Sequence, residues 1–75
     1  MKLAQRLTAI IEREDEGFVA LCPELDIASE GASIEEARVN LIEALTLFFE
    51  TAAPSEVARR FHSEVFVTQV EVPVG

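Results

Sequence analysis

Residue types that support common kinds of protein chemistry are scarce in this chain of 75 residues. The single cysteine, Cys22, cannot form an internal disulfide, and the single histidine, His62, has no second imidazole beside it to support a metal site. The chain also contains no Gly-rich phosphate loop, no CxxC motif and no set of Ser, His and Asp typical of hydrolases. These absences argue against most enzyme classes, so we predict that the chain is not an enzyme and uses no cofactor.

Long apolar runs are absent as well. None approaches the roughly 20 residues that a membrane-spanning helix needs, and the segment 1–6 is not followed by the apolar block of a secretory signal. We therefore expect a cytoplasmic protein with no membrane partner. A chain of this length forms one domain, residues 1–75, with a thin core, so help from a second subunit is plausible.

Positive charge is scarce too, because 14 Asp and Glu residues outnumber 6 Lys and Arg residues, for a formal net charge of −8. The acids are spread from Glu12 to Glu71 rather than gathered in a tail. Such a surface repels phosphate backbones and attracts basic proteins. We therefore expect no direct binding to nucleic acid, and the charge favours a basic partner. The plainer alternative is that the acids keep a small protein soluble.

The apolar residues that are present alternate with polar ones over the first 30 positions, which predicts three strands. We place the first at 6–14, the second at 18–22 and the third at 26–30. The loop before the second strand ends in Gly17, where we expect a positive φ, since glycine adopts it without a Cβ penalty. Pro23 interrupts the ladder before the third strand.

A capping box, in which Ser33 precedes Glu36 by three positions, predicts a helix over 34–52. Pro54 prevents the helix from running on unbroken, and 55–61 forms a short second helical piece capped by Ser55. The stripe that faces the sheet recurs at helical spacing and consists of Ile34, Ala37, Leu41, Ala44, Leu45, Phe48 and Ala52.

Alternation resumes over 63–73, which predicts a fourth strand and a two-layer α+β domain of order β-β-β-α-β. One long helix covers only one side of a sheet, yet both alternation sets contain apolar residues, so the second face should associate with something. We predict a dimer contact there, with the alternative that the piece 55–61 folds over that face. The candidate contact residues are Ile10, Val19, Leu21 and Val67.

Three carboxylates, Glu24, Asp26 and Glu30, form the best candidate for a metal site, because clustered carboxylates bind hard cations. In an acidic chain such spacing also arises by chance, and a solvated strand face is the simpler interpretation. Cys22 has only acids nearby, which raise a thiol pKa, so we interpret it as a small buried hydrophobe. We therefore predict no metal site.

The segment 8–50 resembles the HicB-like antitoxin family in its "A-I-I-E" run, its hairpin glycine, its "C-P-E-L" segment and its "G-A-S-I-E-E-A" helix entry. The resemblance implies a truncated RNase H-like layer that forms dimers or tetramers, in which the "C-P-E-L" segment is structural. The chain departs from the family at Leu21, where an aromatic is common, and over 26–28, where a Pro-Gly turn is common. Its 75 residues leave no room for the C-terminal DNA-binding module of complete antitoxins, so we expect a short form without it.

Complete antitoxins of this family bind and mask a small basic mRNA-cleaving toxin, HicA. The resemblance therefore implies that this acidic chain neutralises a HicA-like partner, and we expect Glu24, Asp26 and Glu30 to make the contact. Two alternatives remain open. The same three carboxylates could keep a residual metal-dependent nuclease activity, or the chain could be a free-standing oligomer with an unrelated partner.

Overall fold

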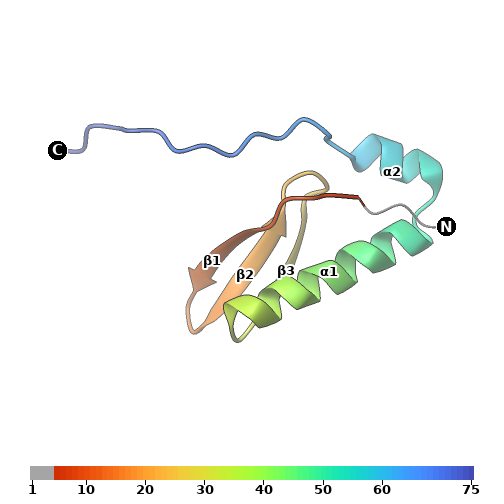
Figure 1. Ribbon diagram of the computed structural model, residues 1–75, viewed down its shortest axis with the longest axis horizontal. Coiled ribbons are helices and arrows are strands. Elements are labelled where there is room, and N and C mark those ends of the chain that lie inside the picture. The colour runs from red at the N-terminus through yellow and green to blue at the C-terminus, as the bar shows by residue number, and fades with distance from the viewer. Residues whose placement is uncertain (1–4) are drawn as a thin grey trace.

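The computed structural model describes residues 5–75 and shows an antiparallel sheet of three strands followed by a long helix and a short one (Figure 1). The strands lie in the order β1-β2-β3, so chain neighbours are also spatial neighbours. The predicted α+β class is confirmed. The elements are β1 (Ile10–Glu14), β2 (Gly17–Cys22), β3 (Ile27–Gly31), α1 (Ile34–Thr51) and α2 (Pro54–Arg60). The prediction that the first strand begins at residue 6 was wrong, because pairing with β2 starts only at Ile10.

The β1–β2 hairpin turns in a different way from the one expected. Glu14 pairs with Gly17, which leaves a two-residue loop, and Asp15 has the positive φ of 54°. Gly17 does not have a positive φ, so that expectation was wrong. Aspartate visits the left-handed region more easily than most residues, because its short polar side chain can bond to the local backbone. Gly17 instead lies where a Cβ would come within 3.0 Å of the Gly31 carbonyl oxygen.

The β2–β3 turn explains why the third strand begins one residue later than expected. The Cys22 carbonyl oxygen accepts bonds from the backbone N–H groups of Asp26 (2.8 Å) and Leu25 (3.3 Å). Asp26 has a φ of 55°, in the left-handed region, and such a residue cannot extend a strand. The strand therefore starts at Ile27.

The start of α1 at Ile34 is confirmed, with Ser33 as its N-cap. The Ser33 hydroxyl oxygen accepts a bond from the Glu36 N–H at 3.0 Å, as a capping box requires. In a capping box the Glu36 carboxylate would accept from the N–H of Ser33, but here it accepts from the N–H of Ala32 (2.6 Å) instead. A Cβ on Gly31 would overlap the backbone of Ala37, so the first turn of α1 lies directly against the end of β3.

The core lies between α1 and the sheet and is small, as expected for a chain of this length. α1 packs chiefly over β3 and β2, and it contacts β1 least. Most of the predicted helical stripe faces this core, but Ile34 is 55% exposed. The helix ends at Thr51, one residue earlier than expected, and Ala52 caps it. The fully buried apolar residues are Ala20, Cys22, Leu25, Ala37 and Leu41.

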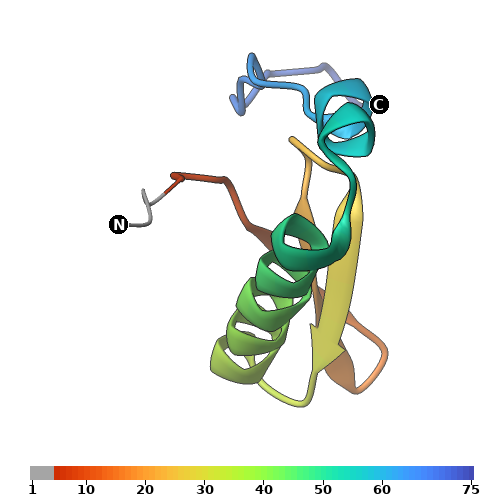
Figure 2. The ribbon, with the colours of Figure 1, turned by 90° about the vertical axis from the view of Figure 1, so that its right-hand side faces the viewer.

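The short helix α2 begins at Pro54, preceded by Ala53 as N-cap, and not at a Ser55 cap as expected. The missing N–H of proline costs nothing at the first helical position. The end of α2 is fastened to the β2–β3 turn, where Arg60 Nη2 donates to the Leu25 carbonyl (3.1 Å) and the His62 N–H donates to the Glu24 carbonyl (2.7 Å). Figure 2 shows α2 at the end of the sheet, so it does not cover the face opposite α1.

The predicted fourth strand over 63–73 is not formed in the described part of the chain. Residues 63–75, which we call the arm, extend away from the rest of the protein without pairing (Figure 1), and every residue from Phe66 to Gly75 is exposed. The radius of gyration is 14.5 Å, whereas a compact domain of this length has one of about 11 Å. Alternating apolar residues favour an extended backbone, but a strand also needs a partner edge.

Candidate partner-binding face

The strand register divides the sheet into two faces, and the face opposite α1 is the candidate site. Ala20 is buried under α1, and its cross-strand partners Ile11 and Ser29 share that covered side. Residues one position along each strand point the other way. They form two cross-strand rows that together we call the free face: Ile10, Leu21 and Ala28 in one row, and Glu12, Val19 and Glu30 in the other.

The free face combines apolar and acidic side chains. Ile10, Leu21 and Val19 are half-buried, whereas Glu12 and Glu30 are exposed on either side of Val19. Further acids follow at the hairpin end, where a shallow hollow of about 480 Å³ is lined by Glu14, Asp15, Glu16, Gly17, Phe18, Val19, Glu30 and Gly31. The face therefore offers apolar area beside a concentration of negative charge.

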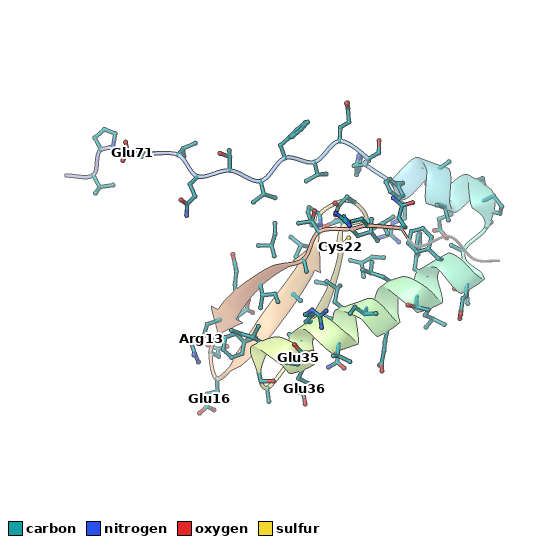
Figure 3. All side chains as sticks on the ribbon, in the orientation of Figure 1. Arg13, Glu16, Cys22, Glu35, Glu36 and Glu71 are labelled. Carbon is teal, nitrogen blue, oxygen red and sulfur yellow. The ribbon has the colours of Figure 1, made fainter. Side chains whose placement is uncertain are left out.

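None of the six residues that define the free face is a lysine or an arginine. Arg13 lies on the covered side of β1, where its guanidinium carbon is 4.6 Å from the centre of the Phe18 ring. In Figure 3, Arg13 lies at the hairpin end of the sheet, as does Glu16. Two other arginines pair with glutamates one helical turn earlier, as Glu35–Arg38 (3.0 Å) and Glu56–Arg59 (3.4 Å).

Glu24 does not lie on this face, although it was one of the three expected contact residues. Its side chain is buried, with 7% exposed, and both carboxylate oxygens accept the Thr8 N–H at 3.1 Å. The Thr8 hydroxyl donates to the same group at 2.6 Å, and the Cys22 thiol donates at 3.4 Å. Burial by itself would raise the pKa of Glu24, but the hydrogen bonds outweigh it and hold the pKa below its ordinary value.

These bonds give Glu24 a structural role, because they join the run before β1 to the β2–β3 turn. A partner cannot reach the carboxylate without breaking these hydrogen bonds. We therefore exclude Glu24 from the proposed contact residues. The burial of Cys22, and then its bond to Glu24, raises the pKa of the thiol, which agrees with the interpretation of this residue as a structural hydrophobe.

The other expected site residues are separated in space. Asp26 is exposed in the β2–β3 turn and Glu30 is exposed on β3, so the three carboxylates face different surroundings. Among residues 5–75, no group of three His, Cys, Asp or Glu side chains could hold a metal ion. The nuclease alternative thus loses its proposed ligand set. Val67 lies on the arm, apart from Ile10, Val19 and Leu21.

Glu12 was missed by the sequence analysis, although it lies on the same face as Glu30. Both flank Val19 in the register, Glu12 from β1 and Glu30 from β3. Alternation could have revealed it, because Glu12 is two residues after Ile10 and so points the same way. The prediction instead grouped acids that are close in sequence, and the intervening turn separates them.

Comparisons with models of known protein families, with curated proteins and with solved structures find no match to this chain. The likeness to the HicB-like family therefore rests on the residues quoted above. Within residues 5–75, neither helix combines the length and the apolar character that crossing a membrane requires.

Proposed function

We propose that this chain is an antitoxin-like binding module of the HicB type, which neutralises a small basic mRNA-cleaving toxin by covering its active site. The observation that carries the proposal is the free face, where half-buried apolar residues lie beside exposed acids and none of the six residues is basic. The sheet of three antiparallel strands followed by a helix is compatible with the truncated RNase H-like layer that the resemblance implies.

The composition of the free face favours a basic protein over a second copy of the chain. Two copies placed face to face would bring Glu12 and Glu30 of one against the same residues of the other, and like charges across a contact destabilise it. A basic partner instead gains from both features. Acids speed the encounter, while Ile10, Val19 and Leu21 provide the apolar area that slows dissociation.

The contact residues that we propose are therefore Glu12, Glu30 and the apolar residues of the free face, with Asp26 directly before β3. Removing a charge at Asp26 calls for asparagine, since asparagine retains the left-handed conformation that the φ of 55° demands. Glu30 has an ordinary strand conformation and can be changed to lysine.

The experiment is a titration of the basic protein encoded by the neighbouring reading frame against the wild type, Glu30→Lys and Leu21→Lys. Glu43→Lys makes the same charge change as Glu30→Lys on the exposed surface of α1 and serves as the control. We expect Glu30→Lys to weaken binding by about 1–3 kcal/mol, mainly through the association rate. Leu21→Lys should mainly speed dissociation, and Glu43→Lys should match the wild type.

Salt provides a second test of the same proposal. Raising it from low to moderate concentration should slow association more than it speeds dissociation, because screening acts on the encounter of separated charges. No binding at either salt concentration would contradict the proposal, and so would binding that ignores both salt and Glu30→Lys. Magnesium- or manganese-dependent RNA cleavage that Asp26→Asn abolishes would favour the nuclease alternative.

A further inference from the structure

The arm has the side-chain pattern of a strand but lacks the pairing of one. Its apolar residues are unusually exposed, with Phe66 at 87%, Val70 at 78% and Val72 at 66%. Among the described residues, no hydrogen bond between two backbone groups involves 63–75. Figure 3 shows the labelled Glu71 far from the sheet and helices. Exposing apolar side chains and unpaired backbone to water is unfavourable, so we expect this segment to pack against another surface.

A groove of about 880 Å³ lies between the run before β1 and the flank of α1. It exists because α1 packs over β3 and β2 and leaves the covered side of β1 partly open. Its apolar lining includes exposed helix residues, Ile42 at 48% and Phe49 at 38%. The main apolar lining residues are Leu7, Leu41, Ile42, Leu45 and Phe49.

The backbone beside this groove is an open strand edge. β1 pairs with β2 alone, so its other side has no neighbour among the described strands. The Thr8 N–H points toward Glu24, on the β2 side. Because backbone groups alternate in direction along an extended chain, those of Leu7 and Ala9 point to the open side, and neither residue has a backbone hydrogen bond to another described residue.

We propose that the arm of a second copy of this chain docks along this open edge, adds a strand beside β1 and the run before it, and fills the groove. Alternation then places Phe66, Val70 and Val72 on the side of the groove, against Ile42, Leu45 and Phe49. The residues between them, Val67, Gln69 and Glu71, face the other way and extend the free face. Val67 thereby joins the surface of Ile10, Val19 and Leu21, contributed by the partner copy.

The reach of the arm and the vacancy of its own β1 edge allow exchange between copies. The His62 N–H bond to the Glu24 carbonyl fixes where the arm begins, and from Phe66 onward the arm is exposed and leaves its own β1 edge vacant. Nine extended residues span about 30 Å, enough to follow the run 6–14. If each copy donates its arm to the other, a closed dimer with two-fold symmetry forms and both open edges are covered.

Pro73 limits the added strand without preventing it. Pro73 has no N–H to donate, so the added strand ends before it. Val72, which faces the groove, precedes the proline and can still pair. The exchange therefore uses residues 64–72. This proposal does not require toxin binding, because the groove and the open edge of β1 lie outside the free face, which the docked arm only extends.

The test is the mass of the full chain in solution, measured by light scattering at micromolar concentration, for two matched pairs of variants. Val70→Asp places a charge on the groove side of the arm, and Gln69→Asp places the same charge on the opposite side. In the second pair, Ile42→Glu places a charge in the groove. Its control, Leu47→Glu, places the same charge on a helix residue that is 59% exposed and lies outside the groove. We expect a wild-type dimer, retained in Gln69→Asp and Leu47→Glu.

Val70→Asp and Ile42→Glu should raise the dimer dissociation constant by about tenfold or more, with an unchanged circular dichroism spectrum that excludes unfolding. A mixture of labelled and unlabelled chains should then show intermolecular NOE contacts between the Val72 and Leu45 methyl groups. A monomeric wild type would overturn the proposal, as would a dimer that tolerates Val70→Asp but is lost in Leu21→Lys. Arm contacts found only within one chain would overturn it too.

Discussion

The two faces of the sheet are built from the same three strands, yet they differ in how closely anything can approach them. The covered face presents two small residues beneath α1, Ala20 and Gly31, and the helix comes close enough for Ala37 to be fully buried. The free face presents larger side chains, Ile10 and Leu21, beside exposed acids. One face is thus fitted to its own helix, and the other is left available for a partner.

This comparison indicates that burial, and not hydrophobicity alone, decides what a substitution does. Leucines occur on both sides, but Leu41 is 2% exposed whereas Leu21 is half-buried. Glutamates also occur in both environments, buried at Glu24 and exposed at Glu30. Matched substitutions can therefore separate stability from association.

The largest expected effect comes from Leu41→Ala compared with Leu21→Ala. Removing the buried side chain leaves a cavity under α1 and should lower the free energy of unfolding by about 3 kcal/mol. Leu21→Ala should lower it by less than about 1 kcal/mol, because solvent already reaches that side chain. Urea denaturation measures both. Equal losses would show that the two faces do not differ as described.

The next effect concerns the contact between α1 and β3, in Gly31→Ala. The new methyl group would overlap the Ala37 backbone and push the helix away, at a cost of about 2 kcal/mol. Gly17→Ala is the control, since its methyl group would meet only the Gly31 carbonyl oxygen at 3.0 Å and its φ is not positive. Thermal unfolding should separate the two variants, and a more stable Gly31→Ala would refute the close packing.

A smaller effect with a distinct pH dependence is expected for Glu24→Gln. Because the folded-state pKa of Glu24 lies below its ordinary value of 4.5, the carboxylate stabilises the fold above that pH. This contribution is lost as the pH falls through the folded-state pKa. The variant should lose about 1–3 kcal/mol at neutral pH and show a flatter decline in stability with acid. A decline as steep as that of the wild type would contradict the role of Glu24.

The smallest effect is expected for Glu30→Gln, which makes the same chemical change on the free face. Its carboxylate is exposed and its cross-strand neighbour is Val19, so the free energy of unfolding should change by less than about 0.5 kcal/mol. Chemical denaturation at neutral pH measures this change, and a loss comparable to that of Glu24→Gln would remove the contrast.

Local patterns predicted most of the elements. Period-two alternation located three strands, and the Ser33 cap with helical spacing located α1 to within one residue at each end. The positions of these strands and of α1 depend on residues that are close together along the chain, and the sequence gives those directly. Some errors fell at turns: Asp15 and Asp26 have the positive φ values, and Pro54 rather than Ser55 begins α2. Others concerned segments without a pairing partner, because the first strand begins at Ile10 and not at residue 6, and the fourth strand over 63–73 is not formed.

The candidate site was predicted less well, for a reason of geometry. Glu24, Asp26 and Glu30 are close in sequence, but a turn with Asp26 at a φ of 55° puts the first inside the protein and the others outside. Glu12 and Glu30 are 18 positions apart and lie on one face because β2 holds both strands in register. Proximity across a sheet depends on pairing, and spacing along the chain does not report it.

The sequence by itself determined the α+β class, the net charge of −8 and the residues that can form strands and helices, because these follow from composition and local periodicity. Only the tertiary structure decided that Glu24 is a buried structural carboxylate, that α2 leaves the free face open, and that the arm extends without a partner. Those outcomes depend on which surfaces meet when the chain folds. The free energy of such contacts comes from burial and hydrogen bonds between residues far apart in the sequence.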